Sequence, residues 1–167
     1  MQENPSGDES LRPTAFRERT EASGNQAEGI VVERWGNPEV LALVQGDPTI
    51  VLEGGQVLFK EGDSADGMYV VKSGTLRIRS GSVVYEDAVA GGIVGEMAIV
   101  EDELPRSAMV YALGRTEVVK IGEKRFFDMV AENPTFARTV MRVLSRRLRH
   151  MDRIYQPERR MEHIPQS

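Results

Sequence analysis

Short runs of apolar and β-branched residues fill the chain from about Thr49 to Ile121, and small turn-forming residues separate them. The runs are TIVL, QVLF, GMYVVKSGTLRIR, SVVYEDAV, SAMVYAL and TEVVKI, and the separators include EGG, EGDSADG, KSG and RSGS. Many short strands at close and even spacing predict an all-β sandwich or barrel, and not a series of βαβ units. Within TLRIRS, Leu76 and Ile78 alternate with arginines, which predicts a strand with one side facing solvent.

Helical patterns flank this β-rich region. NPEVLALVQG predicts a helix of one or two turns, with Pro38 at its first position and Gly46 as its stop. GEKRFFDMVAEN predicts a short helix that ends at the Asn133-Pro134 step. The following 22 residues, PTFARTVMRVLSRRLRHMDRIY, predict an amphipathic helix, because apolar residues recur at intervals of three to four. These apolar residues are Phe136, Val140, Val143, Leu144, Leu148, Met151 and Ile154. We expect their stripe to pack against the barrel, with a dimer seam as the second interpretation, and the fold to be α+β.

The composition fits one soluble domain. The chain has 167 residues, enough for a hydrophobic core, and it contains no cysteine for disulfides or thiolate chemistry. No apolar run approaches the roughly 18 residues that a membrane span needs, and the acidic start MQENPSGDES is unlike a signal peptide. The formal net charge of −5 gives no global reason to expect nucleic acid. We therefore expect a cytoplasmic protein with no membrane span.

Three segments are expected along the chain. Residues 1–28 are rich in Glu, Ser, Gly, Asn and Gln and predict a disordered N-terminal tail, because such a segment buries too little apolar surface to become ordered. Residues 29–155 are expected to form the domain, and residues 156–167 a polar C-terminal tail.

The segment GGIVGEMAIVEDELPRSAMV, residues 91–110, sets one acid and one arginine into otherwise apolar surroundings. Gly95 permits close approach of the backbone, and Glu96 begins a stretch that can form one helical turn. Arg106 follows ten residues later, beyond the acidic turn EDEL. A sugar phosphate needs an arginine fork for its anion and a carboxylate acceptor for its hydroxyl. One turn and one loop can fold Arg106 back over Glu96 with space for a small anion between them.

This segment resembles the phosphate-binding cassette of cyclic nucleotide-binding domains, whose pattern is Phe-Gly-Glu, three apolar residues, a short loop, Pro-Arg and two small residues. The chain has GEMAIV from Gly95 and PRSAMV from Pro105, and the resemblance covers about Val57 to Ile154. Val94 stands where the family has Phe. The loop between the acid and the arginine is one residue longer than in protein kinase regulatory subunits and matches the bacterial catabolite activator type. The resemblance implies that the barrel is a double-stranded β-helix, or jelly roll, with a short N-terminal helix and C-terminal helices.

The resemblance also implies roles for individual residues and a cyclic nucleotide as the ligand, with cAMP favoured over cGMP and the base preference left open. Glu96 would accept the ribose 2′-hydroxyl, Arg106 would pair with the cyclic phosphate, and Ser107 would add a hydroxyl at the phosphate or base. Backbone N–H groups of Gly95, Glu96 and Ala98 would help to cradle the phosphate. The complete implied ligand-binding set is Val94, Gly95, Glu96, Met97, Ala98, Arg106, Ser107, Ala108 and Arg146, with Val94 and Ala108 as walls.

Arginines cluster on the last predicted helix: Arg138, Arg142, Arg146, Arg147, Arg149 and Arg153. The first interpretation is a solvated face with cations toward a helix C-terminus. A second is that one of them, Arg146 near mid-helix, folds over the nucleotide base as a lid. A third is contact with acidic partners or nucleic acid.

Four functions are weighed. The first is a cyclic nucleotide-binding sensor without catalytic activity, cofactor or metal, a monomer or weak dimer that signals to an unknown protein effector when its C-terminal helices re-dock. A metal-dependent barrel enzyme is disfavoured, because the only histidines, His150 and His163, lie in the last helix and tail. A DNA-binding activator is disfavoured, because about thirteen residues after Ile154 are too few for a helix-turn-helix domain. A degenerate, non-binding interaction domain, or a regulatory fragment of a larger protein, remains the alternative.

Overall fold

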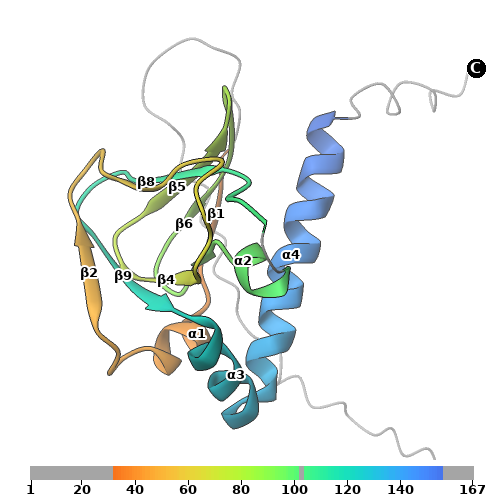
Figure 1. Cartoon of the computed structure of the whole chain (residues 1–167). Helices are drawn as coiled ribbons and strands as arrows, with labels where there is room; N and C mark the ends of the chain where they lie inside the picture. Colours follow the sequence, from red (N-terminus) through yellow and green to blue (C-terminus); the bar gives the residue numbers. More distant parts are fainter. Residues whose placement is uncertain (1–31, 102–103, 156–167) are drawn as a thin grey trace, which may run out of the picture.

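The computed structural model describes residues 32–101 and 104–155, with side chains described as far as residue 152. The predicted tails at 1–28 and 156–167 lie outside the described residues. The elements in chain order are β1 Glu33–Trp35, α1 Pro38–Leu43, β2 Thr49–Leu52, β3 Val57–Phe59, β4 Met68–Ser73, β5 Leu76–Ser80, β6 Val83–Ala88, β7 Ile93–Val94, α2 Met97–Val100, β8 Met109–Ala112, β9 Thr116–Ile121, α3 Glu123–Glu132 and α4 Pro134–Tyr155. The helices gather on one side of a β-barrel, and α4 extends along its flank (Figure 1).

The strands form two sheets, with orders β1-β6-β5-β8-β3 and β2-β9-β4-β7. Strand pairs are antiparallel except β1 with β6, which is parallel. The predicted α+β jelly roll is confirmed. Each predicted β run holds at least one strand, whereas β1 and β7, with three and two residues, were not predicted. The predicted alternation in TLRIRS is confirmed, since Leu76 and Ile78 are buried and their arginine neighbours are not.

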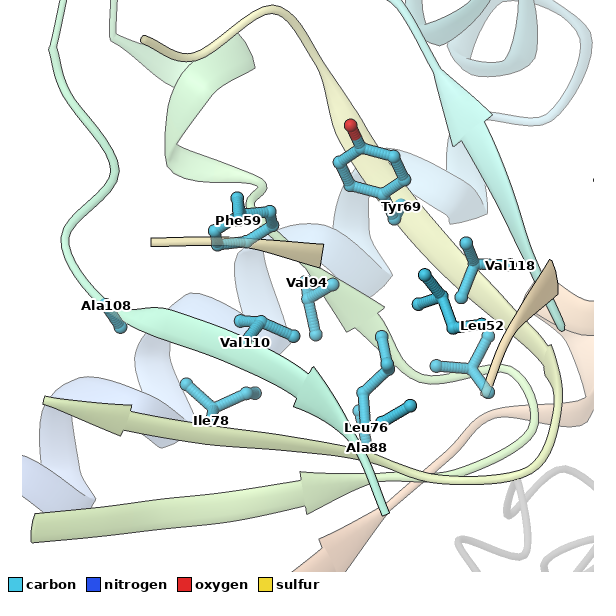
Figure 2. Packing of buried hydrophobic residues seen from close by; sticks show 12 residues of the cluster. Leu52, Phe59, Tyr69, Leu76, Ile78, Ala88, Val94, Ala108, Val110 and Val118 are labelled. Atoms are coloured by element: carbon cyan, nitrogen blue, oxygen red, sulfur yellow. The ribbon is translucent and has the colours of Figure 1, made fainter. Parts of the chain in front are cut away.

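The first hydrophobic core fills the space between the two sheets. Figure 2 shows its side chains converging from strands of both sheets, among them Leu52, Leu76, Val94 and Val118. Burial of such side chains is the main favourable term in folding such a domain.

A second core lies between the β2-β9-β4-β7 sheet and the helices. On β4, Tyr69 and Val71 belong to the first core, whereas Met68 and Val70 belong to the second. This strand is therefore covered on both faces, which explains its uninterrupted apolar run MYVV. Residues from α1, α3 and α4 complete the second core, including Phe136.

The helices begin and end for identifiable local reasons. The Asn37 side chain accepts a hydrogen bond from the Glu39 N–H at 2.8 Å and caps α1, and Pro38 occupies its first position as predicted. The helix ends at Leu43, three residues before the predicted stop at Gly46. Asn133 adopts extended backbone between α3 and α4, at the predicted boundary.

The apolar stripe of α4 is only partly core. Phe136, Val140 and Val143 are buried as predicted, but the Leu148 and Met151 residues are 63% and 40% exposed. The expectation that these two residues pack in the core is therefore wrong, because both line a cavity between α4 and the barrel and not a filled core. Ile154 lies beyond the described side chains. None of the helices in the described ranges is long and apolar enough to cross a membrane.

Candidate ligand-binding site

A cavity of about 410 Å³ lies between the barrel, the segment that follows β7, and α4. Its size falls in the range of small-molecule sites, about 300–1,000 Å³. Eight of the nine residues implied by the sequence line it: Val94, Gly95, Glu96, Met97, Ala98, Arg106, Ser107 and Ala108. The barrel adds apolar walls through Phe59 and Ile78, and α4 adds Leu144 and Leu148. The cavity is thus mostly apolar, with a few charged groups.

The chain reaches the cavity through a sharp turn. After β7, Gly95 adopts a φ of 73°, which is the left-handed region that glycine accepts without strain. The single turn of α2 follows, in which the Ala98 N–H donates to the Gly95 carbonyl at 3.2 Å and the Ile99 N–H to the Glu96 carbonyl at 3.0 Å. The Ala98 N–H, one of the expected phosphate donors, therefore already has a backbone partner.

Arg106 is one of two arginines in the described ranges that line the cavity. Only 5% of this residue is exposed, and its Nη1 donates to the Gly67 carbonyl at 2.7 Å and to the Gly95 carbonyl at 3.2 Å. Its Nη2 lies 3.4 Å from Asp66 Oδ1, and the guanidinium carbon lies 4.2 Å from the Phe59 ring centroid. Its Nε is buried and has no hydrogen-bond partner among the residues that the structure describes. The head group is thus fixed from one side and keeps unused donor capacity.

Glu96 is one of two acids in the described part of the chain that line the cavity, and it is 3% exposed. Its Oε2 forms an ion pair with Arg147 Nη1 from α4. The same guanidinium donates to Glu86 on β6, from Nε at 3.0 Å and from Nη2 at 2.6 Å, and to the Ile93 carbonyl at 2.7 Å. Burial opposes the charge of Arg147, but the ion pairs with Glu96 and Glu86 outweigh it and raise the pKa of Arg147 above its usual value.

Arg146 is the one predicted ligand-binding residue that does not line the cavity. Its Nη2 lies 2.8 Å from Glu86 Oε2, and its guanidinium carbon lies 5.0 Å from the Trp35 ring centroid. Burial lowers the pKa of Arg146, although attraction to Glu86 opposes the shift; an arginine remains charged in either case. Arg146 therefore extends from α4 toward Trp35 on β1 and Glu86 on β6. Its neighbour Arg147 faces the cavity.

Arg147 and Glu86 are site residues that the sequence reasoning did not select. A signal for Arg147 was present, because it lies four residues after Val143 and seven after Val140, both buried on the barrel-facing side of α4. Glu86 had a weaker signal, since it is one of two adjacent acids, with Asp87, in the largely apolar β run SVVYEDAV. The remaining polar residue from α4 at the cavity is His150.

Comparison with known proteins gives consistent results. A family model described as the cyclic nucleotide-binding domain matches residues 49–133. The transcriptional activator protein Anr of Pseudomonas protegens is 34% identical over 103 residues, which is 59% of this chain and 41% of Anr. The catabolite activator protein of Thermus thermophilus has a similar structure, with a TM-score of 0.59 and 27% identity over 69% of this chain and 56% of that one.

A lysophospholipase, nte1 of Neurospora crassa, is also similar, with 29% identity over 105 residues. The match covers 60% of this chain but 7% of the lysophospholipase. The similarity therefore concerns one small part of that much longer protein.

Proposed function

The chain belongs to the cyclic nucleotide-binding domain family, and on this premise we propose that it is a regulatory sensor that binds cAMP in preference to cGMP. Ligand binding changes how α4 docks on the barrel, and this change is read by a protein partner. The domain is a binding module and catalyses no reaction of its own.

The observation that carries the proposal is the state of Arg106. A buried guanidinium with an unpartnered Nε is costly unless another group satisfies it. Because Nη1 is anchored to two carbonyls, Nε and the weakly held Nη2 remain for two oxygens of an anion. A cyclic phosphate matches this fork. Glu96 supplies the acceptor for the ribose 2′-hydroxyl at the same cavity.

The apolar walls suit a purine base. Ile78 on β5 and Leu144 on α4 line the cavity together with the largely exposed Leu148. A base placed here covers Leu148 and adds contact between the barrel and α4, which favours the docked position of the helix. Ser107 at the cavity, rather than threonine, agrees with the preference for cAMP.

Titration calorimetry of the chain with cAMP, cGMP and AMP tests the proposal. We expect cAMP to bind more tightly than cGMP and AMP not to bind, because AMP lacks the cyclic phosphodiester. Arg106→Ala removes the fork for the anion and is expected to weaken cAMP binding about ten- to a hundredfold, from a charged hydrogen bond of about 1.5–3 kcal/mol. Arg138→Ala on the exposed face of α4 is the control and should bind as the unsubstituted chain does. Unchanged affinity in Arg106→Ala would contradict the proposal.

One observation favours the alternative of a non-binding interaction domain. The two groups assigned to the ligand already have protein partners, Glu96 through Arg147 and Arg106 through Gly67, Gly95 and Asp66. Thermal unfolding separates the two functions. A ligand present at 100 times its Kd stabilises the folded protein by about 2.7 kcal/mol. Absence of any shift with cAMP or cGMP at millimolar concentration would favour the alternative.

A further inference from the structure

Arg147 connects three parts of the molecule that are distant in sequence. From α4 it reaches Glu96 on the cavity, Glu86 on β6 and the Ile93 carbonyl on β7. The hydrogen bonds to the two acids span 51 and 61 residues of chain. Because 19% of the Arg147 side chain is exposed, against 4% for Glu96 and 6% for Glu86, these pairs are largely shielded from solvent.

The environment of Glu96 makes its orientation depend on Arg147. The carboxylate is 3% exposed and lies on a cavity with mostly apolar walls, where an unpaired carboxylate is unstable. Within the described residues, the cation that forms an ion pair with Glu96 is Arg147. Arg147 contacts only Oε2, and a carboxylate has two oxygens with about four acceptor positions. The pair therefore leaves acceptor capacity for a hydroxyl group.

The other end of Arg147 is held firmly. Its Nε and Nη2 both donate to Glu86 Oε1, and Arg146 pairs with Glu86 Oε2. Glu86 is itself 4% exposed and lies on a strand in the middle of a paired sheet. A rigid strand thus fixes the guanidinium, and the guanidinium fixes Glu96.

We propose that Arg147 is a positioning residue for ribose recognition: it holds the Glu96 carboxylate, ionised and oriented, so that the free acceptor positions face the 2′-hydroxyl of the nucleotide. The inference rests on the proposed function and adds a residue from α4 to it. Arg147 does not touch the hydroxyl and acts through Glu96. Discrimination between a ribose and a 2′-deoxyribose ligand is therefore a property of the docked α4, and not of the barrel alone.

The test compares cAMP with 2′-deoxy-cAMP by titration calorimetry in four proteins: the unsubstituted chain, Arg147→Met, Arg147→Lys and Arg149→Met. The unsubstituted chain should bind 2′-deoxy-cAMP roughly ten- to a hundredfold more weakly than cAMP, the effect of one charged hydrogen bond. Arg147→Met should reduce the ratio of the two dissociation constants, that of 2′-deoxy-cAMP over that of cAMP, to within about threefold, mainly through weaker binding of cAMP. Arg147→Lys should recover part of the ratio, since its ammonium can pair with Glu96 but cannot also form the fork with Glu86. Arg149→Met, exposed on the same helix, should keep the full ratio.

The outcomes separate this inference from the proposed function. If the unsubstituted chain binds neither cAMP nor cGMP, the proposed function and the inference both fail. If it binds cAMP but a folded Arg147→Met keeps the full ratio, or the unsubstituted chain shows no ratio at all, the inference alone is overturned. If circular dichroism shows that Arg147→Met is unfolded, Glu86→Gln replaces it. Loosening Arg147 from β6 should then lower the ratio at least about threefold, and an unchanged ratio overturns the inference.

Discussion

Replacement of Gly95 by alanine should damage both the stability of the protein and its ligand site. The φ of 73° at Gly95 lies in a region that costs an L residue about 1–2 kcal/mol. A Cβ at this position would lie 2.5 Å from Arg106 Nη1, so the arginine has to move. That nitrogen donates to the buried Gly67 carbonyl at 2.7 Å, a charged hydrogen bond worth about 1.5–3 kcal/mol. We expect the free energy of unfolding to fall by about 2.5–5 kcal/mol and cAMP affinity to fall with it.

Gly55→Ala is the matched control. Gly55 has a φ of 85°, and a Cβ there would meet nothing within 4 Å, so this variant carries the backbone strain without the clash. Its expected loss is about 1–2 kcal/mol. Urea denaturation followed by the fluorescence of Trp35, the single tryptophan, measures both variants. The prediction fails if Gly95→Ala and Gly55→Ala lose the same free energy of unfolding to within about 0.5 kcal/mol. It also fails if Gly95→Ala binds cAMP as tightly as the unsubstituted chain.

Two further predictions concern the stability of the fold. Thr116→Val should lower the free energy of unfolding by about 1–3 kcal/mol in urea denaturation, because the fully buried Thr116 Oγ1 accepts from the Thr75 N–H at 3.1 Å; a loss below 0.5 kcal/mol would contradict this. Asp66→Asn should change how stability depends on pH, since the hydrogen bond from Lys120 lowers the pKa of the Asp66 carboxyl from its ordinary value of 3.8. A lowered pKa stabilises the fold above the ordinary value and loses that effect as the pH falls through the folded value. The unsubstituted chain should therefore exceed Asp66→Asn by up to about 1 kcal/mol at neutral pH, a small effect because the pair is exposed, and thermal melts should converge below pH 3.8.

The parts of the site that the sequence predicted are those close together along the chain. The eight predicted lining residues fall between Val94 and Ala108, where a glycine turn, one helical turn and a returning loop bring them together. Local conformation alone therefore places them on one cavity. The strands were predictable for a similar reason, since the alternation at Leu76 and Ile78 follows from the pleat of a single strand.

The parts that the sequence missed depend on how distant elements dock. Whether Arg146 or Arg147 meets the cavity depends on the rotation of α4 about its axis, and one residue changes the facing direction by about 100°. The buried Val143 sets that rotation, and it selects Arg147. The strands β1 and β7 are too short, at three and two residues, for an alternation to be recognised. Leu148 is exposed because it lines the cavity, and the sequence of α4 alone does not encode where that cavity lies.

Arg106 and Glu96 should contribute differently to a sensor. A ligand shifts α4 only if it binds the docked and undocked states with different affinity. Among the described residues, Arg106 contacts the barrel and its loops, so a phosphate bound to it would add affinity in both states. Glu96 is joined to α4 through Arg147, so a hydroxyl at Glu96 is sensitive to the position of the helix. On the proposed function, we therefore expect Arg106 mainly to set how tightly the nucleotide binds, and the Glu96–Arg147 pair to determine how far binding moves α4.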